Sequence, residues 1–189
     1  MKYIRSTIIA FVSLTILCGV IYPLVVTGIS QVLFKYQANG SIILQNGNEV
    51  GSSLIGQSFS QEKYFWSRPS ATANNPYNGL ASGGSNLGPL NPALLVSVKE
   101  RAIALQKTNP NTVIPADLVT ASGSGLDPEI SLAAAYFQVP RVSVARRVSI
   151  DKLNSLIAQN TKTPILGFLG ENRVNVVELN LSLDNMKGQ

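Results

Sequence analysis

The sequence contains no histidine and a single cysteine, and these two shortages exclude several chemistries. Without an imidazole there is no histidine-activated serine or cysteine nucleophile, no histidine-ligated metal, and no imidazole acid or base near neutral pH. One cysteine can form neither a disulfide within the chain nor a thiolate cage for a metal. Cys18 lies in an apolar stretch, where a thiol acts as a small hydrophobic side chain. Most familiar hydrolase mechanisms are therefore excluded.

Charge is also scarce, and its distribution predicts a membrane span. Charged residues make up 13% of the chain against 45% apolar residues, and the 29 residues from Ser6 to Phe34 carry no charge. A helix of that length rises about 40 Å, which exceeds the roughly 30 Å of a bilayer's hydrocarbon core. We therefore expect residues 1–35 to form a short tip and one span over about residues 7–33, with a kink at Pro23.

A cleaved signal peptide is the alternative, since Lys2 and Arg5 would also fit its positive region. The apolar run is longer than usual for such a peptide, and no alanine between Ala10 and Ala38 supplies a cleavage site. An anchor that stays attached is the favoured interpretation. Lys2 and Arg5 on one side, against Lys35 on the other, then predict a cytoplasmic amino terminus and an extracytoplasmic domain over residues 36–189.

The net charge does not indicate a nucleic-acid partner. Removing the flanking cations Lys2, Arg5 and Lys35 from the total of +5 leaves +2 for residues 36–189. The basic character of the chain thus partly reflects its membrane flanks. A domain that binds nucleic acid would carry a stronger basic patch.

The first part of the outer domain is predicted to contain a hairpin and a long loop. Residues 41–55 indicate a hairpin that turns at Asn46-Gly47. Between Ser67 and Pro92, 17 of 26 residues are Asn, Pro, Gly or Ser, and Arg68 is the only charge. Disorder is one interpretation, but low charge favours an ordered loop. Its expected anchors are Tyr77, Leu80, Leu87 and Leu90.

The second part is predicted to contain three helices and a strand, which gives an α+β domain. Asn91-Pro92 starts a helix that ends at Asn109-Pro110. Asp127-Pro128-Glu129 indicates a helix over residues 130–138 that Pro140 ends or kinks, and Ser149 starts another. The alternation of apolar and polar residues from Val177 to Asp184 predicts a half-buried strand.

The motifs that could carry chemistry are weak. Gly83-Gly84 and Gly123-Ser124-Gly125 lack the Lys-Ser/Thr pair of a phosphate loop, so tight turns and close packing explain these glycines better. Asp127 is better explained as a helix cap than as a catalytic acid, and the acids do not cluster as metal ligands do. Arg141, Arg146 and Arg147 could suggest a DNA-binding face, but an outer domain favours solvation, or pairing with a partner subunit or lipid.

An ordered series of segments closely resembles one protein family over nearly the whole chain. The segments are Ile21-Tyr22-Pro23, Gly51 to Gln57, Tyr64 to Ser70, Ser82 to Pro89, Asp117 to Asp127, Ala135 to Gln138 with Arg141, and Val174 to Asp184. Together they resemble the C subunit of the bacterial Kdp potassium-transporting ATPase, in order and with the span in the expected place.

The resemblance implies a non-catalytic accessory subunit in the bacterial inner membrane. Its partners would be a channel-like potassium-translocating subunit, a P-type ATPase subunit and often a very small fourth subunit, with membrane lipid around the span. ATP and Mg would act at the pump subunit, and no metal or cofactor is expected on this chain. Family descriptions credit the C subunit with assembling the complex and raising ATP affinity, and the glutamine corresponding to Gln138 is proposed in nucleotide binding. An external domain would keep Gln138 away from cytoplasmic ATP, so any effect would be indirect.

The nearly uncharged loop from Ser67 to Pro92 is the expected contact surface, because its groups can bond across an interface without desolvating charges. The candidate contact residues are Arg68, Tyr77, Asn78, Ser85, Asn86 and Arg141. The alternative from another class is a membrane-anchored extracytoplasmic enzyme or ligand-binding module.

Overall fold

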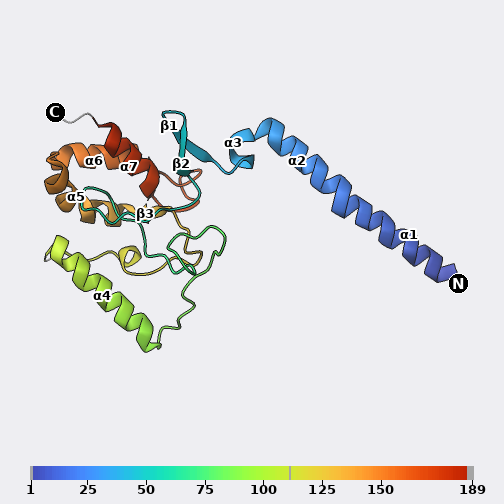
Figure 1. Cartoon of the computed structure of the whole chain (residues 1–189), viewed down its shortest axis with the longest axis horizontal. Coiled ribbons are helices and arrows are strands. Elements are labelled where there is room, and N and C mark those ends of the chain that lie inside the picture. The colour runs from blue at the N-terminus through green and yellow to red at the C-terminus, as the bar shows by residue number, and fades with distance from the viewer. Residues whose placement is uncertain (1, 111, 187–189) are drawn as a thin grey trace. The chain divides into compact units, whose positions relative to one another are not determined.

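The computed structural model describes residues 2–110 and 112–186, and the chain divides into two compact units. The first unit ends at Ile42 and the second begins at Ile43 (Figure 1). The predicted boundary between residues 35 and 36 stays a prediction, because contacts within the protein do not mark where a chain leaves a bilayer.

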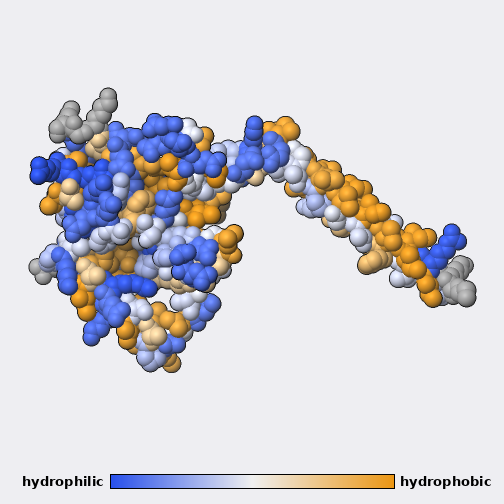
Figure 2. Space-filling view, in the orientation of Figure 1, coloured by the Kyte–Doolittle hydropathy of each residue, from blue (hydrophilic) through white to orange (hydrophobic). Residues whose placement is uncertain are grey.

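The first unit is almost entirely helical. It consists of α1 (Lys2–Ile16), a π-helical turn (Leu17–Ile21), α2 (Tyr22–Leu33) and the short α3 (Lys35–Ala38). Tyr3–Leu33 is one stretch of 31 residues, long and apolar enough to cross a membrane, and Figure 2 shows apolar residues along this rod. The hydroxyls of Thr7 and Thr15 donate to carbonyls one turn back at 2.9 and 2.8 Å, which hides their polarity from a lipid environment.

A π-helical turn at Leu17–Ile21 lies just before Pro23, where a kink is expected. Proline has no backbone N–H, and its ring collides with the carbonyl four residues earlier in a regular helix. The wider turn immediately before α2 relieves this collision, and Pro23 then lies in the first turn of α2, where no N–H is required. The chain therefore stays helical across the proline.

The second unit is a mixed α+β fold, as predicted. The hairpin of β1 (Ile42–Gln45) and β2 (Asn48–Ser52) turns at Asn46 and Gly47, whose φ angles are +53° and +82°. A separate antiparallel sheet has the order β3-β5-β4, formed by β3 (Glu129–Ser131), β4 (Thr161–Lys162) and β5 (Arg173–Asn175). The remaining elements are α4 (Pro92–Thr108), a 3₁₀ turn (Ala116–Leu118), α5 (Leu132–Arg146), α6 (Ile150–Gln159) and α7 (Val176–Asn185).

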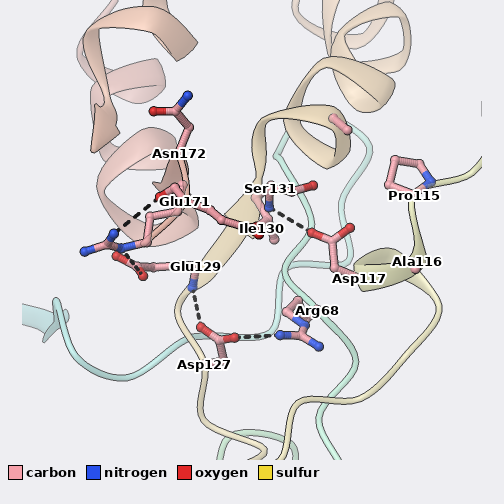
Figure 3. A pocket seen from close by; sticks show the side chains of 12 residues that line it. Arg68, Pro115, Ala116, Asp117, Asp127, Glu129, Ile130, Ser131, Glu171 and Asn172 are labelled. Atoms are coloured by element: carbon pink, nitrogen blue, oxygen red, sulfur yellow. Dashed lines mark hydrogen bonds and ion pairs between the residues drawn. The ribbon is translucent and has the colours of Figure 1, made fainter. Parts of the chain in front are cut away.

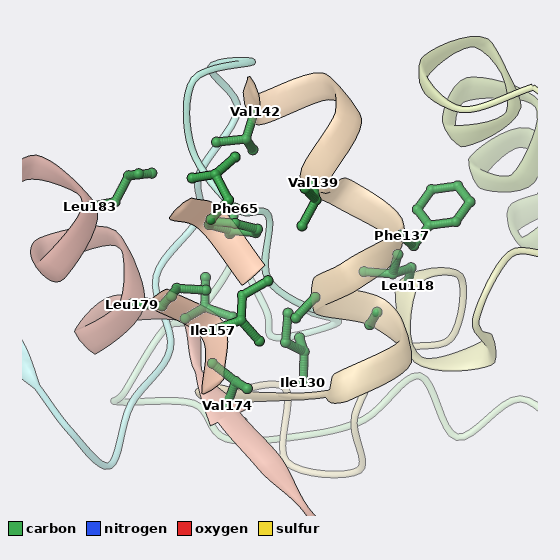
Figure 4. Close-up of a cluster of buried hydrophobic side chains, with 14 of the residues drawn as sticks. Phe65, Leu118, Ile130, Phe137, Val139, Val142, Ile157, Val174, Leu179 and Leu183 are labelled. Atoms are coloured by element: carbon green, nitrogen blue, oxygen red, sulfur yellow. The ribbon is translucent and has the colours of Figure 1, made fainter. Parts of the chain in front are cut away.

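The core lies where α5, α6 and α7 pack with the three-stranded sheet. Ile130 and Val174 face each other across β3 and β5, and both are buried. Figure 4 shows Phe65 among side chains of α5 and α7, and this residue is completely buried although it belongs to neither a helix nor a strand. An extended segment therefore runs through the interior of the unit.

The predicted strand from Val177 to Asp184 is wrong, because these residues belong to α7. The apolar positions at Val176, Leu179 and Leu183 also fit a helical repeat, and all three are buried. Asn175 decides the outcome locally: its side chain accepts the N–H groups of Val177 and of the next residue at 3.0 and 3.1 Å, which is a helix cap.

The helix predicted over residues 130–138 begins later and continues further. Glu129–Ser131 is strand β3, and Ser131 caps α5 by accepting the N–H of Ala134 at 3.0 Å. Asp127 is therefore not a helix cap. Pro140 does not end α5, which runs to Arg146. The carbonyl that the missing proline N–H would have met belongs to Tyr136, a residue that is 42% exposed.

Helix α4 starts at the predicted residue, with Asn91 accepting the N–H of Ala93 at 2.9 Å. Its apolar face is less buried than the pattern predicts, since Leu105 is buried but Leu95 is 63% exposed. In the preceding loop, Leu80 and Leu90 are 99% and 93% exposed, so neither anchors it as predicted. Polar groups and glycines hold this loop instead.

Glycine is required where two loops cross. Gly83 N–H donates to the carbonyl of Ser124 at 2.8 Å, and Gly125 lies against the same loop with φ +67°. A Cβ on Gly125 would be 2.6 Å from the Gly83 carbonyl oxygen and 2.6 Å from Thr72 Cγ2. The predicted role in close packing is confirmed for Gly125 and for Gly84, whose Cβ would be 2.9 Å from the Gly123 carbonyl oxygen.

Gly125→Ala should destabilise the second unit by at least about 2 kcal/mol, because the new methyl group requires both a left-handed backbone and a shift of the facing loop. Chemical unfolding of the solubilised full chain, followed by the fluorescence of Trp66, measures the loss. Gly123→Ala is the matched control, since its Cβ meets nothing within 4 Å. A change of less than about 1 kcal/mol is expected there, and equal effects at both positions would contradict the close-packing role.

Candidate functional site

The extended segment through the core is held by two side-chain amides. Trp66 N–H donates to Gln138 Oε1 at 2.7 Å, and Gln138 Nε2 donates to the Trp66 carbonyl at 3.1 Å. Asn180 does the same for Phe65, with both distances 2.9 Å. Each amide thus supplies the donor and acceptor that a neighbouring strand would supply. We call this arrangement the amide clamp; its members are Phe65, Trp66, Gln138 and Asn180.

Gln138 has no free hydrogen-bonding end in this arrangement. Its side chain also donates to the carbonyl of Ala134 at 3.2 Å and accepts from Arg141 Nη2 at 2.8 Å, and the residue is 2% exposed. Its carbonyl oxygen and both amide hydrogens are occupied within the protein. Nucleotide contact by Gln138 stays a prediction, and it would require this residue to leave the clamp.

Arg141 reinforces the same segment from α5. It donates to the carbonyl of Glu62 and, at 3.0 Å, to that of Tyr64, and its guanidinium lies 3.7 Å from the centroid of the Trp66 ring. Burial lowers the pKa of Arg141 to about 10, and the nearby Glu62 acts in the opposite direction. The group therefore stays charged near neutral pH, and carbonyl oxygens and an aromatic face take the place of water. It lies in the interior, so contact with a partner subunit stays a prediction.

Arg68, Tyr77 and Asn78 shape the loop from inside. Arg68 pairs with Asp127 at 2.8 Å, and the Tyr77 hydroxyl donates to the carbonyl of Arg68. Burial raises the pKa of Tyr77, so the hydroxyl stays protonated and able to donate. Asn78 spans its own turn, donating to Ala73 at 3.1 Å and accepting the N–H of Leu80 at 3.0 Å.

Ser85 and Asn86 differ from the other candidates because both are exposed. Neither side chain has a hydrogen-bond partner in residues 2–110 and 112–186. They lie within a stretch from Pro69 to Val98 that contains no charged residue and also presents the exposed side chains of Leu80, Leu90 and Leu95. We call this surface the uncharged face. Its own residues offer exposed polar and apolar groups, and none of them is charged.

A cavity of about 540 Å³ is lined by residues of β3, by Arg68 and Asp127, and by the start of the 3₁₀ turn (Figure 3). Five of its six charged side chains are engaged within the protein: Asp127 with Arg68, Glu129 with Arg173 at 2.7 Å, and Asp117 with the N–H of Ser131 at 2.8 Å. The sixth, Glu171, is exposed. No cluster of three metal-ligating side chains occurs within the described ranges. The residues that line the cavity therefore form an ion-pair network that is more typical of a structural role than of a reaction centre.

Sequence reasoning missed Asn180 and Trp66 as members of the clamp. The strand interpretation placed Asn180 on the solvent side, whereas it is 2% exposed. Read as a helix, the same sequence places Asn180 next to Leu179 and Leu183 on a buried face, and a lone amide among apolar residues would have marked it. Its partner, 115 residues earlier, has no sequence signal of its own.

The architecture defines a class: proteins with one amino-terminal helix long and apolar enough to cross a membrane, and a second, α+β unit organised around a buried extended segment. The particular family follows from comparison. The chain belongs to the KdpC family, since the family model described as "KdpC: K+-transporting ATPase, c chain" matches residues 4–185. The resemblance in the sequence motifs is thereby confirmed.

Relatives match along nearly their whole length. Proteins named potassium-transporting ATPase KdpC subunit from Janthinobacterium sp. (strain Marseille) and Polaromonas naphthalenivorans (strain CJ2) are both 56% identical, over 95% and 97% of this chain and 96% and 95% of their own. The protein of that name from Serratia proteamaculans (strain 568) is 50% identical over 99% of this chain and 100% of its own.

Gln138→Ala and Asn180→Ala should each lower the free energy of unfolding by about 2–4 kcal/mol, because each leaves a buried backbone N–H and C=O without partners. Denaturant unfolding of the solubilised chain measures both losses. Gln159→Ala is a control at an exposed position of α6 and should change stability by less than about 0.5 kcal/mol.

The substitutions Gln138→Ala and Asn180→Ala also distinguish a structural role of Gln138 from direct contact with nucleotide. If Gln138 acts through the clamp, both substitutions change the ATP affinity of the assembled ATPase equally. A loss of ATP affinity confined to Gln138→Ala would show that this residue contacts nucleotide.

Proposed function

We propose that this chain is a non-catalytic accessory subunit of an ATP-driven potassium uptake complex. Its relatives are named as subunits of a potassium-transporting ATPase, and the matched region covers almost the entire chain. Five of the six charged side chains that line the cavity of about 540 Å³ are engaged with each other or with the backbone, which favours a structural role over catalysis. ATP and Mg act at the pump subunit of the complex.

The chain crosses the membrane once, with its amino terminus in the cytoplasm and its second unit outside. The support for this orientation is the excess of cations before the span, Lys2 and Arg5, over Lys35 after it. The second unit then meets only the external surfaces of its partners. A channel-like subunit that takes potassium from outside is the partner we assign to it.

The uncharged face is the docking surface for that subunit, and it is the observation that carries the proposal. An interface of Asn, Ser and backbone groups with apolar side chains avoids the desolvation penalty of buried charges. The loop crossing, the Arg68–Asp127 pair and the Tyr77 hydroxyl hold this face before a partner arrives, which lowers the entropy lost on binding.

Any influence on the ATP affinity of the pump is indirect in this arrangement. Gln138 and Arg141 hold the extended segment, the segment leads into Arg68, and Arg68 supports the loop that bears Ser85 and Asn86. These residues therefore preserve the docking surface, and a docked subunit stabilises the assembled pump. Assembly is the function that the chain performs for the complex.

Alkaline phosphatase fused after Gln189 should be active, because this reporter folds only outside the cytoplasm and the proposed orientation places the carboxyl terminus there. Enzyme activity in intact cells is the measurement. The same reporter fused after Arg5, before the span, is the control and should be inactive. The reverse pattern would contradict the orientation without affecting the proposed docking surface.

The double substitution Leu80→Glu with Asn86→Lys should reduce recovery of the channel-like subunit with the tagged chain by at least about tenfold, because it places unpaired charges in the interface. Potassium uptake should fall in parallel. Gln159→Lys, an exposed change on α6, is the control and should leave both measurements unchanged. Normal recovery and uptake with the double variant, at unchanged stability, would remove the uncharged face as the interface.

A further inference from the structure

An apolar turn connects β4 and β5 and carries four exposed hydrophobic side chains. Ile165, Leu166, Phe168 and Leu169 are 65%, 79%, 73% and 52% exposed, and no charged residue occurs from Thr163 to Gly170. Single exposed apolar residues are ordinary on protein surfaces, whereas a contiguous group marks a place of contact. This turn lies outside the uncharged face and is not explained by the proposed docking.

The backbone of the turn forms four hydrogen bonds within itself. Ile165 and Leu169 exchange both of their N–H···O bonds at 3.0 Å, and Gly167 donates to the carbonyl of Pro164 at 3.1 Å. Phe168 donates to the carbonyl of Ile165 at 3.4 Å. A segment that enters lipid must pair its backbone internally, because the hydrocarbon offers no partners. A peptide that docks on a protein edge keeps these groups open for the other chain instead.

The conformation of the turn and the strand that follows it also fix its position on the second unit. Leu166 and Gly167 have φ angles of +55° and +79°, which give the tight reversal that suits two adjoining antiparallel strands. β5 continues directly into the core, where Val174 is completely buried. The exposed side chains are therefore presented on a fixed support.

The cations that flank the turn are engaged within the protein. Lys162 pairs with Glu178 at 3.0 Å, and Arg173 pairs with Glu129 at 2.7 Å. Neither is left as a free partner for lipid phosphates. Contact through this turn depends on apolar burial and should not depend on anionic headgroups.

The bilayer is within reach of the second unit. Only residues 34–42 separate the end of the candidate span at Leu33 from the first residue of the second unit, a connection of at most about 30 Å when extended. A tether this short keeps the unit at a high effective concentration near the membrane, so a small apolar contact suffices.

We propose that the turn from Pro164 to Gly170 inserts Ile165, Leu166, Phe168 and Leu169 into the interfacial layer of the same bilayer that the span crosses. The span and the turn then attach the protein to the bilayer at two separate places. This contact limits the tilting of the second unit over the membrane. It requires no particular orientation of the chain across the membrane.

A fluorescent label sensitive to polarity tests the insertion. Cys18→Ser provides a background without cysteine, and Phe168→Cys then places the label on the turn of the full chain in phosphatidylcholine vesicles. Lipids with a spin label near the headgroup should quench this fluorescence at least about twofold. The quenching should be the same in phosphatidylglycerol vesicles and at about 0.5 M salt, because the flanking cations are paired.

Leu80→Cys in the same background is the matched control, since Leu80 is also an exposed apolar residue of the second unit, and its label should not be quenched. Leu166→Ser combined with Phe168→Cys should reduce the quenching while leaving the unfolding transition unchanged. Equal accessibility of positions 168 and 80 would overturn the proposal. Protection of position 168 only after partner subunits are added would also overturn it and assign the turn to a protein partner.

Discussion

The backbone of Phe65 and Trp66 crosses the interior of the second unit without a neighbouring strand, so its hydrogen bonds must come from side chains. Gln138 and Asn180 supply them from two different helices. Because each amide both donates and accepts, neither helix can rotate without breaking two bonds in a dry environment. The positions of α5 and α7 are therefore fixed relative to one segment that has no regular structure of its own.

This arrangement connects the core to the surface through a short path. Phe65 fills the space between the helices, Trp66 lies under the Arg141 guanidinium, and Arg68, two residues later, pairs with Asp127 at the loop crossing. The ordering of the uncharged face is thus a consequence of core packing. A loop rich in Asn, Ser, Pro and Gly is held at its first end by the buried segment and further along by its hydrogen bonds to Ser124 and Gly125.

The sequence was sufficient to predict elements whose start or turn is determined by neighbouring residues. The Asn46-Gly47 hairpin and the start of α4 at Asn91-Pro92 both follow from neighbouring residues, and both are confirmed. The predicted span is a helix long and apolar enough to cross a membrane. The sequence was insufficient where two patterns coincide, as in α7, whose apolar spacing fits a strand and a helix equally. It was also insufficient for the amide clamp, because the partners of Gln138 and Asn180 lie 72 and 115 residues away. Side-chain amides pair with any backbone group within reach, so composition alone does not reveal which one.

The π-helical turn before Pro23 affects more than the proline itself. A turn closed by bonds to the fifth residue uses about one additional residue, which delays the rotation of everything after it by roughly a quarter turn. Side chains of α1 and α2 that would form one continuous stripe in a regular helix are therefore offset from each other. The two halves of the rod display different sides to their surroundings, so a single straight neighbour cannot follow the same stripe along its whole length.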